Sequence, residues 1–479
     1  MPQSASSGLL SRIKTWRSLW GGSGGARDGT EVGPVHPDLP EADAERVRKH
    51  MNACLEVVGG EVSARKRAAS LGRAYLGLAP LGRERFLRIL VDDFEVDHQI
   101  VDIAIERLGN SEDQAERIRA EMALRLALEA PRLKILTQFN GLPEGVKFLV
   151  DMRAEVMRLA SRQPAFAPLE ADLKSLLTSW FDVGFLEMTR VTWQSPASLL
   201  EKIIAYEAVH AIQSWDDLKN RLDSDRRLYA FLHPRMPDEP LIFVQVALVG
   251  GMADNVQAVL DETAPVLNNE DADTAIFYSI SNAQQGLSGI SFGNFLIKRV
   301  VDSLSHEFPN LKTFATLSPI PGFRKWLDEK LAVGEPGFLN NAEHKALMTL
   351  LGGGSGAKGG LKSLLARSDW HREEAVAQVM KGPLLRLCAR YLATEKRPTP
   401  SGAPDRALDP VAHFHLSNGA RMERLNWLGD TSAKGVQQSA GIMINYLYKL
   451  SEIERNHEAY SSEGKVTTST TIKSLLKGA

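Results

Sequence analysis

One serine lies in a stretch whose backbone is strongly restricted. In TFATLSPIPGF, residues 313–323, polar and apolar residues alternate as in a strand up to Ser318, and Pro319 and Pro321 then limit the backbone. A hydroxyl fixed in this way can orient a reacting group or take part in proton transfer. The stretch does not indicate a hydrolase nucleophile, because the Gly-x-Ser-x-Gly pattern is absent and a proline follows the serine directly.

Two histidines form the second candidate. His413 and His415 lie in AHFHLSNGA, residues 412–420, whose alternation predicts a strand with both imidazoles on one face. A metal site would need at least a third ligand, and no carboxylate or cysteine lies at a matching spacing, so we expect no metal. The pattern predicts instead that a serine and an imidazole meet at the end of a sheet as hydrogen-bonding and proton-transferring groups.

Two glycine-rich stretches could bind phosphate. GGGSGAKGG, residues 352–360, fits the Walker pattern in no register and predicts a surface loop. QQGLSGISFGN, residues 284–294, lies between an expected strand and an expected helix, where unpaired N–H groups could hold a diphosphate without any lysine. Many turns of this kind bind nothing, so the pattern alone leaves the question open.

The scaffold that must position these groups is predicted in two parts. Residues 1–40 predict a flexible, glycine-rich N-terminal tail, whose basic start could also be a transit peptide. Residues 41–177 show helical spacing of apolar residues throughout and predict an all-α helical bundle for packing or oligomerisation. Residues 178–479 predict a mixed α/β catalytic domain, so the expected fold class is α+β with two domains.

Short β-branched or aromatic runs predict the strands of the second part. The run over 274–280 is followed by a glycine loop, a helix over 293–308 and the run over 312–317. This order is a βαβ unit, whose two strands must be parallel. Residues 323–396 are again largely helical. The predicted strands are 240–249, 274–280, 312–317, 411–416 and 442–449.

The composition limits the possible partners. The chain has 479 residues, of which 43% are hydrophobic and 24% charged, with a formal net charge of -2. These values are typical of a globular protein without general affinity for nucleic acid or an anionic membrane. Cys54 and Cys388 are the only cysteines, which predicts a reducing compartment and no disulfide framework. No apolar run approaches the roughly 20 residues that cross a bilayer, so we expect no membrane span.

Longer stretches carry a resemblance to a known family. The four most specific are FYSISNAQQGLSGISFGNFLIKRVV (277–301), LSPIPGFRKWL (317–327), PLLRLCARYL (383–392) and the run from PVAHFHLSNGA to INYLY (410–448). Together they resemble the malonyl-CoA decarboxylases over most of the second half of the chain. The helical first half also lies where that family places its helical domain.

The resemblance implies roles for particular residues. Ser318 and His415 match the family's catalytic serine and histidine. The second half would have a fold like the GCN5-related N-acetyltransferases, in which a loop before a helix binds the CoA diphosphate. Here the glycines of that loop stand four residues apart, unlike the usual acetyltransferase pattern, and Ser291 replaces a glutamate of many family members, which suggests a tuning role. The loop falls on Ser288, Gly289, Ile290, Ser291, Phe292, Gly293 and Asn294.

The implied function is decarboxylation of malonyl-CoA to acetyl-CoA and CO2, with no metal or organic cofactor. The resemblance further implies a homo-oligomer, a dimer or tetramer formed through the helical domain, in the cytoplasm or, for a eukaryotic protein, the mitochondrion. Two alternatives remain open: an acyltransferase on the same fold that passes an acyl group to an amine, and a binding protein that senses malonyl-CoA. Ser318 and His415 speak against the sensor, which would need neither.

Overall fold

The computed structural model describes residues 30–56, 60–181, 186–290, 296–334, 338–352, 357–399 and 404–477. The chain divides into two compact units. The first unit consists of residues 1–187 with two later segments, 232–241 and 282–291. The second unit contains the remaining residues, 188–231, 242–281 and 292–479. The segment 282–291 therefore packs with the helices although it is distant from them in sequence.

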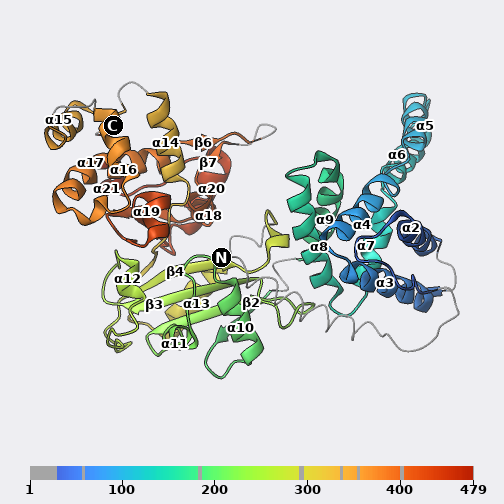
Figure 1. Cartoon of the computed structure of the whole chain (residues 1–479), viewed down its shortest axis with the longest axis horizontal. Helices are drawn as coiled ribbons and strands as arrows, with labels where there is room; N and C mark the ends of the chain where they lie inside the picture. Colours follow the sequence, from blue (N-terminus) through green and yellow to red (C-terminus); the bar gives the residue numbers. More distant parts are fainter. Residues whose placement is uncertain are drawn as a thin grey trace. The chain divides into compact units, whose positions relative to one another are not determined.

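The described part of the first unit is built from α-helices, as the apolar spacing predicts (Figure 1). Several helices begin where the sequence supplies a start signal: Pro80 opens α4, and the side chains of Asp97 and Asp113 cap α5 and α6. The helices are α2 (Glu41–Leu55), α3 (Gly60–Gly77), α4 (Pro80–Asp92), α5 (His98–Gly109), α6 (Gln114–Ala127), α7 (Arg132–Asn140), α8 (Gly145–Ala160) and α9 (Ala167–Trp180).

Residues 30–40 are part of the packed helical unit, although the sequence placed them in the flexible tail. Thr30, Val32 and Leu39 are buried. The Val32 N–H donates to Ser70 Oγ at 2.9 Å, and Glu31 pairs with Arg73. The ordered chain therefore extends N-terminal to α2, and the tail prediction for residues 1–29 lies outside the described residues.

The second unit is organised around a seven-stranded mixed sheet with the order β1-β2-β3-β4-β5-β9-β8. β4 and β5 are parallel, whereas the pairs β2/β3, β5/β9 and β8/β9 are antiparallel. A separate small sheet pairs β6 with β7. The strands are β1 (Glu187–Val191), β2 (Arg226–Leu232), β3 (Ile242–Val249), β4 (Thr274–Asn282), β5 (Thr313–Thr316), β6 (Lys396–Arg397), β7 (Arg406–Ala407), β8 (Arg421–Asn426) and β9 (Met443–Leu447).

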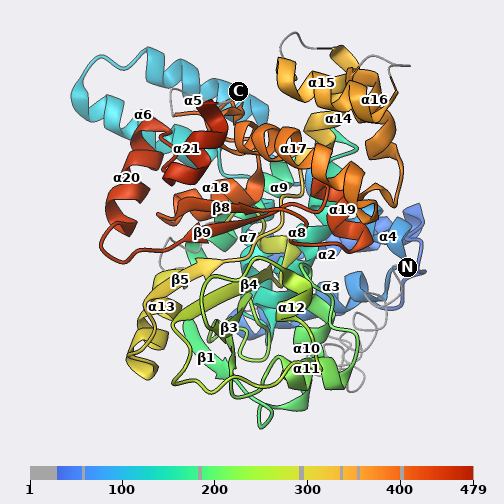
Figure 2. The ribbon, with the colours of Figure 1, turned by 90° about the vertical axis from the view of Figure 1, so that its left-hand side faces the viewer.

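Helices flank this sheet. α21 packs on β8, and α17 packs on α21 (Figure 2). A buried apolar cluster joins α12 to the sheet through Val256, Ile276 and Leu317. The helices are α10 (Ala197–Tyr206), α11 (Trp215–Asn220), α12 (Val256–Val259), α13 (Leu296–Glu307), α14 (Phe323–Val333), α15 (Asn341–Leu350), α16 (Ala357–Ala366), α17 (Glu374–Thr394), α18 (Pro410–Ser417), α19 (Ala433–Ser439), α20 (Ile453–Glu463) and α21 (Thr470–Lys477).

Most of the predicted elements of this unit are confirmed. Four of the five predicted strands correspond to β3, β4, β5 and β9, and the β4–α13–β5 unit is parallel as expected. The helical prediction over 323–396 corresponds to α14 to α17. The surface loop predicted over 352–360 is wrong for its second part, because α16 begins at Ala357. Residues 353–356 lie outside the described residues.

The predicted strand over 411–416 is wrong, because these residues form helix α18. Asp409 caps the helix by accepting from the N–H groups of Val411 and Ala412, and Pro410 occupies its first turn. An aspartate followed by proline is a helix start signal, and it prevails over a two-residue alternation in so short a run.

Among the described helices, none combines the length and the apolar composition that crossing a bilayer requires.

Candidate active site

Ser318 lies two residues after the end of β5 and is almost fully buried. Its main chain is held on both sides by β9: the Ser318 N–H donates to the Ile444 carbonyl at 2.9 Å, and the Ile444 N–H donates to the Ser318 carbonyl at 3.0 Å. Pro319 follows at once. The restriction predicted from the prolines is thus reinforced by a backbone bridge that the sequence did not reveal.

His415 approaches the serine from α18. The imidazole Nε2 lies 3.0 Å from Ser318 Oγ, and the two residues are 97 positions apart in sequence. His415 is 3% exposed and stacks on the ring of Tyr446, with ring centroids 4.5 Å apart. The predicted meeting of a serine and an imidazole is therefore present in the structure.

The other imidazole nitrogen contacts a tyrosine. His415 Nδ1 lies 2.8 Å from the hydroxyl of Tyr448, a fully buried residue that follows β9. Ser318 Oγ donates to Thr316 Oγ1 at 2.8 Å. One neutral tautomer satisfies the whole chain: Tyr448 donates to Nδ1, Nε2–H donates to Ser318, and Ser318 donates to Thr316.

The three side chains of this chain are buried. Burial lowers the pKa of His415 to about 3, because the charged imidazolium would lose its hydration. Burial likewise raises the pKa of Tyr448 well above its usual value. At neutral pH, Ser318, His415 and Tyr448 therefore form a chain of three neutral groups, each able to donate and to accept a hydrogen bond.

One buried carboxylate connects the two backbone elements that carry this chain. Asp409 Oδ1 accepts from the first N–H groups of α18, and Asp409 also accepts from the N–H of Gly322 and from the hydroxyl of Tyr391. Burial raises the pKa of Asp409, and these hydrogen bonds oppose the rise. Gly322 follows the proline pair after Ser318, and a Cβ there would lie 2.1 Å from the Tyr391 hydroxyl. Asp409 thus ties the serine turn to the histidine helix.

His413 does not share the face of His415. In a helix, residues two positions apart point in different directions, and His413 Nδ1 lies 2.9 Å from the hydroxyl of Tyr460 on α20. Burial lowers its pKa to about 4. The prediction of a polar histidine pair on one strand face is therefore wrong, and a single histidine reaches Ser318.

Of the residues proposed for the CoA loop, Ser288, Gly289 and Ile290 are described, whereas Ser291, Phe292, Gly293 and Asn294 lie outside the described residues. Gly289 has a φ of +73°, a backbone conformation that residues other than glycine rarely adopt. The described loop residues belong to the first unit, and Ser318 and His415 belong to the second.

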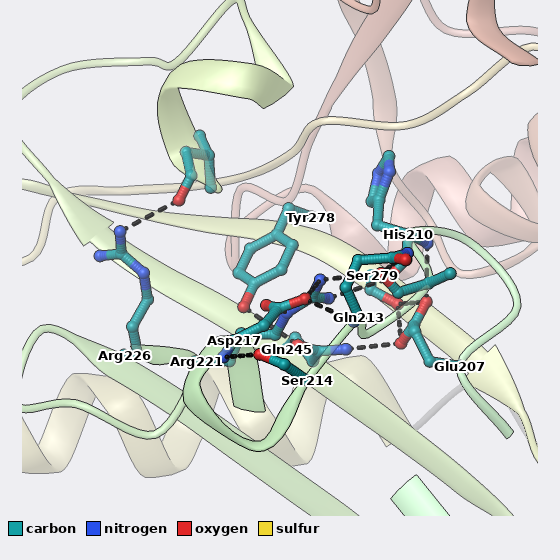
Figure 3. A network of polar contacts seen from close by, with 12 residues as sticks. Glu207, His210, Gln213, Ser214, Asp217, Arg221, Arg226, Gln245, Tyr278 and Ser279 are labelled. Carbon is teal, nitrogen blue, oxygen red and sulfur yellow. Dashed lines mark hydrogen bonds and ion pairs between the residues drawn. The ribbon is translucent and has the colours of Figure 1, made fainter. Parts of the chain in front are cut away.

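Within the described ranges, His, Cys, Asp and Glu nowhere gather in groups of three that could hold a metal ion. A different polar cluster of the second unit surrounds Glu207 (Figure 3). Its buried carboxylate accepts from Ser279, Ser281 and Gln245 and from two backbone N–H groups. This arrangement resembles a structural anchor more than a reactive centre, because every donor around the carboxylate is engaged.

Sequence reasoning missed Thr316, Tyr448 and Asp409. A usable signal existed for two of them. Tyr446 and Tyr448 stand two residues apart in the predicted strand over 442–449, which places them on one face. The Asp-Pro dipeptide at 409–410 marks a helix start. No sequence pattern singles out Thr316.

Comparison with known proteins identifies the family. A model of the malonyl-CoA decarboxylase C-terminal domain matches residues 184–479, and a model of the N-terminal domain matches residues 94–181. This chain is a member of the malonyl-CoA decarboxylase family. The resemblance inferred from the motifs around Ser318 and His415 is thereby confirmed.

Relatives match along most of the chain. Mitochondrial malonyl-CoA decarboxylase of Rattus norvegicus is 39% identical over 430 residues, which cover 87% of this chain and 83% of that protein. The Anser anser anser protein of the same name is 39% identical over 431 residues, covering 86% and 84%. The crystal structure of malonyl-CoA decarboxylase from Rhodopseudomonas palustris is 40% identical with a TM-score of 0.81, covering 90% of this chain and 99% of that one. The Agrobacterium vitis enzyme gives a TM-score of 0.78 at 40% identity and the same coverage.

Proposed function

We propose that this chain converts malonyl-CoA to acetyl-CoA and CO2, and that Ser318 and His415 carry the reaction. Family membership supports the substrate and the overall reaction. The observation that carries the assignment of the site is the 3.0 Å contact between Ser318 Oγ and His415 Nε2 in a buried, neutral environment. The residues implied by the resemblance meet although 97 positions separate them.

The chemistry explains why neutral donors suit this site. Loss of CO2 breaks the bond between the carboxylate and the α carbon and leaves its electron pair in an enolate on the thioester. Donors fixed beforehand stabilise this charge without reorganisation. The Ser318 hydroxyl, held by the backbone bridge to Ile444, serves to hold the malonyl group so that the breaking bond overlaps the carbonyl π system. Exclusion of water from the bound malonyl group would also favour release of neutral CO2 from a charged carboxylate.

His415 completes the reaction by protonating the α carbon. With Tyr448 donating to Nδ1, the proton of the neutral imidazole sits on Nε2, where it is available to the enolate. The enolate is a strong base, so a neutral imidazole N–H is a sufficient acid. This transfer leaves an imidazolate, which takes a proton from solvent once acetyl-CoA has left the site, so each turnover consumes one proton.

The fold assignment belongs to the same proposal. We infer a topology like that of the GCN5-related N-acetyltransferases, with loop 288–294 binding the CoA diphosphate. The parallel β4–α13–β5 unit with this loop before α13 supports the inference. Bulky substitutions at Gly289, whose φ is +73°, should raise the KM for malonyl-CoA. An unchanged KM would place the diphosphate elsewhere.

One assay tests the activity. Purified protein with malonyl-CoA and no other substrate should release CO2 and acetyl-CoA in equal amounts. An acyltransferase would release free CoA only when an amine acceptor is present, and a sensor would bind malonyl-CoA without forming a product.

The proposed reaction uses no metal or organic cofactor, so activity should survive exhaustive dialysis against EDTA. Its loss, with recovery on adding a metal, would contradict this part of the proposal.

We further propose that the chain forms a homo-oligomer, a dimer or tetramer, through the helical unit. Figure 1 shows α5 and α6 as a hairpin extending from the other helices of this unit. Ile118, Met122 and Leu126 form one exposed stripe on α6, each 48% to 66% exposed. In an antiparallel pair of α6 helices, the acidic start around Glu116 would face the basic end around Arg125 of the second copy.

The assembly is tested by light scattering after size exclusion. Met122→Glu with Leu126→Glu should shift the protein to a smaller species and leave the helical content unchanged. An unchanged mass would move the interface to another surface.

Localisation is the last element of the proposal. We infer a cytoplasmic enzyme, with mitochondrial targeting as the alternative that the names of the two curated relatives suggest. A fluorescent protein fused to the C-terminus of the full chain should stay diffuse in the cytoplasm. Import that depends on residues 1–29 would overturn the cytoplasmic assignment.

A further inference from the structure

Alternate residues of β9 and its continuation contact the candidate site. Ile444 forms the backbone bridge to Ser318. Tyr448 contacts His415 Nδ1 with its hydroxyl at 2.8 Å. Between these two positions, the ring of Tyr446 stacks on the imidazole of His415, with centroids 4.5 Å apart and an angle of 25° between the planes. Residues two apart in a strand point to the same face, so one strand contacts both the serine and the histidine.

The stack restrains a movement that the hydrogen bonds leave free. The two imidazole nitrogens contact Tyr448 and Ser318 at the edge of the ring, and the ring can still tilt about the line that joins these nitrogens. An aromatic ring in nearly parallel contact with one face opposes this tilt. The Nε2–H bond lies in the imidazole plane, so the tilt sets the direction in which the proton points.

The main chain of Tyr446 contacts the serine side of the site. Its N–H donates to Thr316 Oγ1 at 3.1 Å. The same oxygen accepts from Ser318 Oγ at 2.8 Å and thereby orients the serine hydroxyl. Tyr446 thus contacts His415 with its ring and supports Ser318 through Thr316. One residue acts on both members of the proposed catalytic pair, although 97 positions separate them in sequence.

The hydroxyl of Tyr446 takes no part in these contacts. The residue is fully buried, and its hydroxyl has no hydrogen-bond partner among the described residues. Burial raises the pKa of Tyr446 well above its usual value, so the hydroxyl stays neutral. A buried hydroxyl without a partner costs free energy. The contacts to the site come from the ring and the main chain, which phenylalanine would also supply.

We propose that Tyr446 is a positioning residue for the reaction, which fixes the plane of the His415 imidazole through its ring and needs no hydroxyl to do so. The proposal rests on the proposed roles of Ser318 and His415. It goes beyond them because delivery of the proton then depends on the tilt of the imidazole as well as on its distance from the serine.

Two substitutions separate the ring from the hydroxyl. Tyr446→Leu removes the flat face and should lower kcat for malonyl-CoA about tenfold, with a much smaller change in the KM, because substrate binding does not depend on the tilt. Tyr446→Phe keeps the face and should keep kcat near that of the unchanged protein. It should also raise the midpoint of denaturant unfolding, because the unpaired hydroxyl is removed. If Tyr446→Leu fails to fold, Tyr446→Met, which is flexible and has no flat face, takes its place.

Phe243→Leu is the control for the loss of a buried ring. Phe243 lies on β3, is fully buried, and is separated from β5 by β4. Its substitution should lower the midpoint of unfolding as Tyr446→Leu does, yet leave kcat per folded molecule unchanged. An equal loss of kcat in both variants would overturn the inference, because general loosening of the core would then explain the lower activity.

A double variant tests whether the ring acts through the histidine. His415→Gln already lacks the imidazole, so adding Tyr446→Leu should lower the residual kcat no further. Release of labelled CO2 from malonyl-CoA measures such low rates. Losses that multiply in the double variant would mean that Tyr446 acts elsewhere and would overturn the inference. So would a loss in Tyr446→Phe equal to that in Tyr446→Leu, because the hydroxyl would then be the active part.

Failure of the proposed function gives a different pattern. If the chain did not decarboxylate malonyl-CoA, the unchanged protein would form no acetyl-CoA. If His415 had no role in the reaction, His415→Gln would keep nearly full kcat. An unchanged kcat in Tyr446→Leu together with a low kcat in His415→Gln contradicts the role of Tyr446 alone.

Discussion

The second unit contains two buried polar clusters that differ in kind. Around Glu207, a charged carboxylate accepts from two serines, a glutamine and two backbone N–H groups (Figure 3). Around His415, neutral groups contact one another in a single chain from Tyr448 to Ser318. The carboxylate is saturated by donors, and its position is thereby fixed. The neutral chain can exchange a hydrogen-bond partner or a proton at little cost, which is what a reacting group requires.

The largest expected effect concerns the neutral chain. Ser318→Ala and His415→Gln should each reduce kcat about a hundredfold to a thousandfold, because alanine removes the hydroxyl donor and glutamine cannot deliver the proton that the imidazole supplies. The KM should change much less, since other residues are proposed to bind CoA. Steady-state kinetics with malonyl-CoA provide the measurement, and circular dichroism confirms folding. A folded variant with nearly full kcat would remove its residue from the proposed mechanism.

Asp409 is a saturated carboxylate like Glu207, yet it serves the reactive pair. Asp409→Asn keeps an acceptor for the start of α18 but places an amide near the Gly322 N–H, which needs an acceptor. The substitution should therefore displace His415 slightly relative to Ser318. Such a displacement should lower kcat about tenfold to a hundredfold at nearly constant KM. Asp97→Asn, at the exposed cap of α5, is the control. Equal kinetic effects in both variants would argue against a link to the site.

Ser318 and His415 could be predicted from the sequence, whereas the Glu207 cluster could not, and the missing part has a physical reason. Pro319 and Pro321 indicated that the backbone at Ser318 is restricted. The order of strand, glycine loop, helix and strand predicted the parallel β4–α13–β5 unit. Local signals could place Asp409 at a helix start and Tyr448 on a strand face, but the residues that they contact are distant in sequence, and such contacts leave no local period. The misassignment of 411–416 has another cause: an alternation over six residues is too short to outweigh a capped helix start.

Glu207 should affect stability and not chemistry. Glu207→Gln replaces an acceptor-only group by one that also donates, so donors such as Ser279 and Gln245 lose partners in a buried site. We expect a loss of about 1–3 kcal/mol in the free energy of unfolding, with kcat per folded molecule unchanged. Denaturant unfolding and kinetics on the same preparation measure both. A fall in kcat without loss of stability would reverse the roles assigned to the two clusters.

Two histidine–tyrosine pairs allow a matched comparison. Tyr448 contacts His415 Nδ1 at 2.8 Å, and Tyr460 contacts His413 Nδ1 at 2.9 Å. Tyr448→Phe should lower kcat about tenfold, because the tautomer with its proton on Nε2 loses its support. Tyr460→Phe should leave kcat unchanged. If both variants behave alike, Tyr448 contributes packing alone.

A further expected effect is a pH dependence of stability that originates at His415. The unfolded chain binds a proton at this residue below about pH 6.5, whereas in the folded protein the pKa is lowered to about 3 by burial. The unfolded state therefore gains protons first, and stability falls as the pH drops from about 6.5 toward 3. Between about pH 7 and pH 5, this residue should contribute a loss of about 2 kcal/mol in unfolding free energy.

His415→Gln isolates that contribution, since glutamine does not titrate. The variant should lose less stability than the unchanged protein over the same interval, and the difference between the two curves reports His415 alone, because the carboxylates and His413 titrate in both proteins. Parallel curves would mean that His415 takes up a proton in the folded state near its ordinary pKa. The imidazole would then be charged at mildly acidic pH, and the neutral character that separates this cluster from the one around Glu207 would be lost.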